Sequence, residues 1–134
     1  MSKLGFPESV WLEEFAWKVR GAFGGEVYHV GSSVEAGEYH DVDVRLLLQP
    51  DAYAALLPGC TPETEVGHPR WLALCQAFSL LGRQMTGLKV DFQIQRLPDA
   101  MLAFSGWLSQ PLGRIFPLPP ATPRLEGPGS PPGP

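Results

Sequence analysis

Cysteine is scarce in this chain, with only Cys60 and Cys75 among 134 residues. Two cysteines cannot build a disulfide framework, and there is no C-x-x-C pair or Cys/His spacing typical of a zinc site. Cys75 falls within an apolar helical pattern, which indicates a small buried hydrophobic side chain. The sequence therefore excludes disulfide-stapled scaffolds and zinc-finger proteins.

Long apolar runs and an excess of positive charge are also missing. No segment approaches the roughly 18 apolar residues that suggest a membrane span, and residues 1–11 lack the apolar core of a signal peptide. We therefore expect a cytoplasmic protein without a membrane partner. Ten Lys and Arg against fourteen Asp and Glu give a net charge of −4. Such a balance predicts no strong nucleic-acid footprint, but it suits a small nucleotide bound together with metal ions.

The composition changes at Pro111, since nine of the fifteen prolines lie from there to the end. A segment so rich in proline and glycine does not form a helix or an internal strand. We expect residues 1–110 to form one domain with its own core, followed by a Pro/Gly-rich tail over residues 111–134.

Apolar periodicity predicts the elements of this domain. Helical spacing predicts helices over residues 7–23, 50–57 and 71–84, and a weaker helix over 98–108. Apolar runs and alternation predict strands over residues 26–30, 41–48 and 88–95. Together they predict an α/β (α+β) fold, in which a small mixed sheet of three to five strands has helices packed on one side.

The stretch from Val27 to Val44 carries the clearest chemical signal. Its apolar start breaks at Gly31, Ser32 and Ser33, and the next strand places Asp41 and Asp43 two residues apart, on one face. Two neighbouring carboxylates repel each other unless a cation lies between them, and Mg²⁺ is commonly held by carboxylates together with substrate phosphates. The Gly-Ser-Ser turn lacks bulky side chains, so its backbone N–H groups can approach an anion. This stretch predicts a site for a nucleoside triphosphate with magnesium.

A third acidic residue, Asp91, lies between Val90 and Phe92 in a later apolar strand. An unpaired carboxylate buried there costs several kcal/mol, roughly 2–7 for an uncompensated polar group. A shared metal ion removes this cost. The alternative interpretation places Asp41 and Asp43 at a solvated strand end, where they have no chemical role, and leaves Asp91 outside any metal site.

In this order, Val30-Gly31-Ser32, Asp41-Val42-Asp43-Val44 and the strand containing Asp91 resemble the nucleotidyltransferase superfamily that includes DNA polymerase beta. That family has a hydrophobic residue before Gly-Ser or Gly-Gly, an Asp-x-Asp about ten residues later, and a third acid on a later strand. The resemblance covers residues 15–95. His40 stands where the family commonly has a serine, and the length is similar to that of the minimal nucleotidyltransferases.

The resemblance implies a nucleotidyltransferase-like fold and the transfer of a nucleoside monophosphate from a triphosphate such as ATP to an acceptor hydroxyl, with release of pyrophosphate. Asp41, Asp43 and Asp91 would be the catalytic residues and the ligands of two Mg²⁺ ions, and Gly31, Ser32 and Ser33 would bind the phosphates. The alternative is a catalytically degenerate domain of the same fold, which binds a nucleotide or a protein and is antitoxin-like.

Minimal members of the family often pair with a separate helical protein. The apolar cluster between Trp107 and Leu118 adjoins the proline-rich tail. We expect it to pack against a second chain, either in a homodimer or on a helical partner. Packing onto the chain's own core is the alternative.

Overall fold

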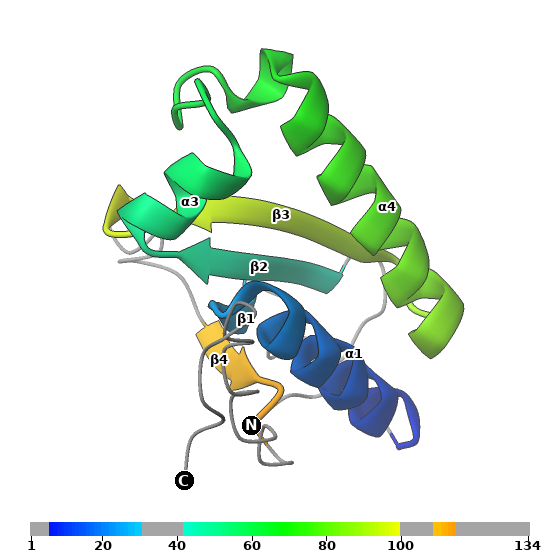
Figure 1. Cartoon of the computed structure of the whole chain (residues 1–134). Coiled ribbons are helices and arrows are strands. Elements are labelled where there is room, and N and C mark those ends of the chain that lie inside the picture. The colour runs from blue at the N-terminus through cyan, green and yellow to red at the C-terminus, as the bar shows by residue number, and fades with distance from the viewer. Residues whose placement is uncertain (1–5, 31–41, 100–108, 115–134) are drawn as a thin grey trace, which may run out of the picture.

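The computed structural model describes residues 6–30, 42–99 and 109–114 of the chain (Figure 1). The elements in these ranges are, in chain order, α1 (Glu8–Phe23), β1 (Glu26–Val30), β2 (Val42–Leu48), α3 (Pro50–Leu56), the 3₁₀ helix η1 (Glu65–Gly67), α4 (Pro69–Thr86), β3 (Val90–Arg96) and β4 (Ser109–Leu112). No helix among them is long and apolar enough to cross a membrane.

The four strands form one mixed sheet in the order β3-β2-β1-β4. β1 is antiparallel to both β2 and β4, whereas β2 and β3 are parallel. Parallel neighbours need a crossover connection, and α3, η1 and α4 supply it here. The expected small mixed α/β sheet is confirmed.

The core lies between one face of this sheet and the helices α1 and α4, which Figure 1 shows on the same side. Phe92 of β3 is its centre. The Phe92 ring meets Phe15 of α1 edge-on, with 6.2 Å between ring centroids, and packs against Phe78 of α4 at 5.5 Å. Such offset aromatic contacts add to the stabilisation that burial alone gives.

The buried face of α1 differs in part from the predicted one. The sequence indicated an apolar stripe with Val10 and Trp11 at its start, but these side chains are 38% and 42% exposed. The buried residues are Leu12, Phe15, Ala16 and Val19. This set has the i, i+3, i+4, i+7 spacing of one helix face, and its small member Ala16 allows another segment to approach the helix closely.

That segment is β4 and the glycine that follows it. Leu112 pairs with Val27 and is only 2% exposed, within the core. Pro111 fits here because β4 is an edge strand, where the missing N–H is tolerated. The expected domain boundary after residue 110 thus falls inside β4, and residues 111–114 pack on the chain's own sheet and helix. Most of the helix expected over 98–108, and the tail from residue 115, lie outside the described residues.

The close contact between Gly113 and α1 generates a prediction. Gly113 has φ +75°, and an added Cβ would lie 2.7 Å from the Ala16 carbonyl carbon and the Trp17 nitrogen. Gly113→Ala should lower the free energy of unfolding by about 1–3 kcal/mol, because it combines a left-handed backbone with a backbone clash. Urea denaturation measures this.

The control is Gly67→Ala, because a Cβ at Gly67 meets nothing within 4 Å. It should unfold within about 0.5 kcal/mol of the parent. Equal stabilities for the two variants would mean that residues 109–114 do not pack on α1 in solution.

Candidate active site

The structure places Asp43 and Asp91 side by side. They are register partners on the parallel strands β2 and β3. Their neighbours Val44 and Phe92 belong to the core, so by strand alternation both carboxylates lie on the sheet face opposite α1 and α4. The Asp43 side chain is 30% exposed and that of Asp91 46% exposed. Two partly accessible carboxylates therefore share one patch of this face.

The other expected site residues lie outside the described residues: Gly31, Ser32, Ser33 and Asp41. Gly31 follows directly on Val30, which is the register partner of Asp43. Asp41 directly precedes Val42, the first residue of β2. In the sequence, Gly31, Ser32 and Ser33 thus follow the end of β1, and Asp41 precedes the start of β2, the strand that carries Asp43.

A buried cation accompanies the carboxylates. The Arg45 side chain, 9% exposed, places Nη2 at 4.0 Å from Oδ1 of Asp43 and 3.9 Å from Oδ2 of Asp91. Its Nη1 donates hydrogen bonds to the carbonyl oxygens of Asp91 at 2.8 Å and of Val44 at 3.1 Å. Burial lowers the pKa of the guanidinium, while the charges of Asp91 and Asp43 act in the opposite direction. The fixed positive charge between the strands reduces the repulsion between the two carboxylates.

The donor chemistry suits a hard divalent cation, because carboxylate oxygens are the ligands that Mg²⁺ prefers. Asp43 and Asp91 are two such ligands on adjacent strands. Among residues 6–30, 42–99 and 109–114, no group of three or more His, Cys, Asp or Glu is placed to hold a metal ion. A site with three carboxylates would need Asp41 as well.

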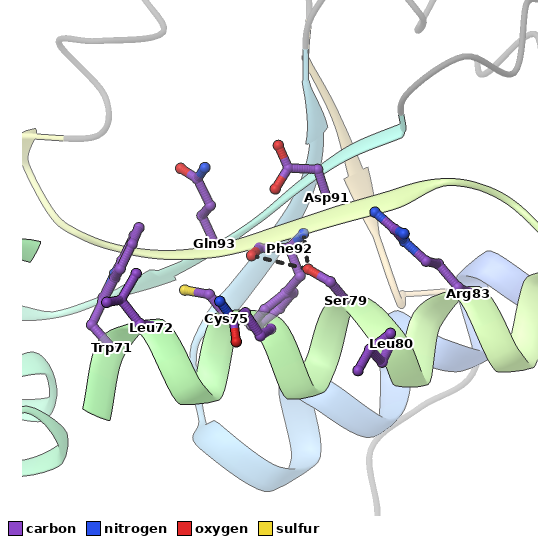
Figure 2. Close-up of a pocket in the computed structure, with 10 residues that line it drawn as sticks. Trp71, Leu72, Cys75, Ser79, Leu80, Arg83, Asp91, Phe92 and Gln93 are labelled. Carbon is purple, nitrogen blue, oxygen red and sulfur yellow. Dashed lines mark hydrogen bonds between the residues drawn. The ribbon is translucent and has the colours of Figure 1, made fainter. Parts of the chain in front are cut away.

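A groove of about 440 Å³ runs beside Asp91, between β3 and α4 (Figure 2). Figure 2 shows Asp91 and Gln93 projecting from β3 away from the helix, with Arg83 rising from α4 toward the same strand. The exposed Leu80 contributes to the helix side of the groove. The full lining is Trp71, Leu72, Cys75, Gln76, Ser79, Leu80, Arg83, Asp91, Phe92 and Gln93.

Among the residues that line the groove, a row of α4 side chains bonds the outer edge of β3. Arg83 Nε donates to the Val90 carbonyl at 3.2 Å. Ser79 Oγ accepts from the Phe92 N–H at 2.8 Å and donates to the Phe92 carbonyl at 3.5 Å (Figure 2). Trp71 Nε1 donates to the Ile94 carbonyl at 2.8 Å. Side chains of a helix thus satisfy backbone groups that a neighbouring strand would otherwise bond.

The spacing of this row follows from the geometry of the two elements. Residues 71, 75, 79 and 83 are four apart, an advance of about 6 Å per step along a helix. Every second strand residue faces the edge, at intervals of about 6.6 Å. Cys75 fills the remaining position; burial raises the pKa of its thiol to about 11, and a hydrogen bond with the Ile94 backbone partly opposes this rise. The thiol is therefore protonated at neutral pH.

The sequence indicated Cys75 as buried but did not reveal this row. In the sequence, the row appears only as a repeat of Trp, Cys, Ser and Arg at every fourth position. The same repeat is expected in an ordinary amphipathic helix, so it does not predict the contact with β3. Comparisons with protein-family models, with curated proteins and with solved structures find no match to this chain.

The hydrogen bonds of Ser79 can be tested by mutation. Ser79→Ala leaves the Phe92 N–H and carbonyl without this partner at the strand edge. We expect the free energy of unfolding to fall by about 1–2 kcal/mol, and the Phe92 amide to exchange its hydrogen faster in NMR measurements. Gln76→Ala, at an exposed position of the same helix, is the control. Unchanged Phe92 exchange in the serine variant would contradict the described edge.

Proposed function

We propose that this protein is a magnesium-dependent nucleotidyltransferase, which transfers a nucleoside monophosphate from a triphosphate to an acceptor hydroxyl and releases pyrophosphate. The observation that carries the proposal is the register pairing of Asp43 with Asp91 on parallel strands. These acids are 48 residues apart in the chain, yet they share one face of the sheet. Two sequence motifs that carry the family resemblance therefore meet at one place.

The strand order suggests on which side of the Asp43–Asp91 pair each substrate would bind. β2, with Asp43, lies between β1 and β3. In the sequence, Gly31, Ser32 and Ser33 come directly after β1, so we place the triphosphate on the β1 side of the pair. The groove along α4 opens on the other side, next to Asp91. We place the acceptor there, with its hydroxyl directed at the Asp91 carboxylate.

In this proposal each side chain has a defined task. Asp41 and Asp43 hold the metal-bound triphosphate in line with the acceptor. Asp91 orients the acceptor hydroxyl and accepts its proton. Bound Mg²⁺ would supply the positive charge that stabilises the attacking and leaving oxygens. Catalysis then consists mainly of positioning and charge stabilisation.

Arg45 favours a second candidate function. Its guanidinium already places a positive charge near both carboxylates, which is compatible with a domain that keeps the acids for structural reasons. Such a domain would bind a nucleotide or a protein without chemistry. Release of pyrophosphate from any of the four ribonucleoside triphosphates in Mg²⁺, absent in EDTA, distinguishes the enzyme from this alternative.

Asp43→Asn and Asp91→Asn test the site directly. Each keeps the size and polarity of the side chain but removes the charge that would hold the metal ion. In the parent, a triphosphate with Mg²⁺ at about 100 times its dissociation constant should add about 2.7 kcal/mol of stability. Both variants should lose most of this stabilisation in thermal melts. Without ligand they should melt close to the parent, because both carboxylates are partly exposed.

The matched control is Asp51→Asn, which removes a carboxylate from the first turn of α3, beyond the opposite end of β2. It should retain the full stabilisation by the triphosphate. If the Asp43 and Asp91 variants retain it too, the metal does not bind where we place it and the proposed function fails.

A further inference from the structure

We propose that Arg45 makes metal binding at the Asp43–Asp91 pair conditional on the nucleotide. The inference rests on the proposed function and concerns its regulation. In this view the protein holds little divalent metal alone and gains it together with the triphosphate. The fixed guanidinium is the cause.

Arg45 cannot easily move away from the pair. Its side chain is 9% exposed, and Nη1 is held by the carbonyl oxygens of Asp91 and Val44, one on each strand. A buried cation that makes charge-assisted bonds to two neighbouring strands is strongly oriented. Its positive charge is therefore a permanent part of the site, present with or without a ligand.

The charge balance then disfavours a bare metal ion. Asp43, Asp91 and Arg45 together carry a net charge of −1, whereas the two carboxylates alone would carry −2. A divalent ion at the carboxylates lies within a few ångströms of the guanidinium, where repulsion is little screened by salt. A triphosphate bound to the same ion brings several negative charges, which offset this repulsion. The nucleotide is thus the component that makes the metal site favourable.

Substitutions at Arg45 separate its charge from its hydrogen bonds. Arg45→Gln keeps an N–H donor toward the Asp91 carbonyl and removes the charge. Arg45→Lys keeps the charge and changes the hydrogen bonds. Arg45→Met removes both and fills the space with an apolar chain, which provides a second charge-free variant if the glutamine form unfolds. Arg70→Gln removes an exposed arginine that bonds the Leu56 carbonyl, and is the control for the loss of one positive charge from the chain.

The measurement is the affinity for Mn²⁺, followed by electron paramagnetic resonance of free Mn²⁺. It is made without nucleotide and with a non-hydrolysable ATP analogue, and in the second case the Mn²⁺ bound in a protein-free sample of the analogue is subtracted. Circular dichroism verifies that each variant is folded. Without nucleotide, Arg45→Gln or Arg45→Met should bind Mn²⁺ about tenfold more tightly than the parent, equivalent to about 1.4 kcal/mol. Arg45→Lys and Arg70→Gln should match the parent. With the analogue present, the difference between parent and charge-free variants should shrink.

The possible failures are distinguishable. If the parent binds Mn²⁺ with the analogue but the folded charge-free variants gain no affinity for Mn²⁺ alone, the role of Arg45 is refuted and the proposed function stands. The same holds if Arg45→Lys gains as much as Arg45→Gln, because charge would then not be the cause. If the parent binds no Mn²⁺ even with the analogue, the proposed function fails and the role of Arg45 with it.

Discussion

Parallel pairing between β2 and β3 depends on a long crossover, which carries the chain from Leu48 over the core face and back to Val90. Much of the structure follows from it. α4 must run along β3 to return the chain, so its side chains meet the strand edge, and Phe92 meets the aromatic rings of α1 and α4. The register of this pairing also sets Asp43 against Asp91 on the far face. A slip of one residue in β3 would turn Phe92 away from the core and would turn Asp91 toward it.

On the far face of β2 and β3, a buried apolar side chain lies in the same layer as three charged side chains. Leu47, on this face by alternation, is 2% exposed, so the surroundings are in part apolar. Two carboxylates lie in the same layer, and a buried arginine compensates their charge through backbone and side-chain contacts. A buried charge is tolerated only when it is paired and hydrogen-bonded, and Arg45 meets both conditions. The Asp43 and Asp91 side chains stay 30% and 46% exposed, so water as well as Arg45 solvates their charge.

The sequence predicts β2 and β3 and the meeting of Asp43 with Asp91, whereas it does not predict β4, the buried face of α1 or the position of Arg45. Alternation around Asp91 and the continuous run after Asp43 identified both strands, because a period of two is visible in a single segment. The contact of Arg45 with Asp91 could not be predicted, since it requires the register between strands far apart in the chain. β4 was missed because a four-residue strand containing Pro111 has no strand signal of its own. The predicted stripe of α1 includes Trp11, but the buried face follows the spacing of Leu12, Phe15, Ala16 and Val19 instead.

The two edges of the described sheet are closed in different ways. At β3, side chains of α4 bond the outward carbonyl and amide groups. At β4, the strand spans only four residues and contains Pro111, which has no N–H group to bond an added strand. Open strand edges are the usual templates for amyloid-like stacking and for recruitment of a strand from another molecule. The α4 side chains at β3 and the short, proline-containing β4 therefore make both described edges poor templates for the addition of a strand from another molecule.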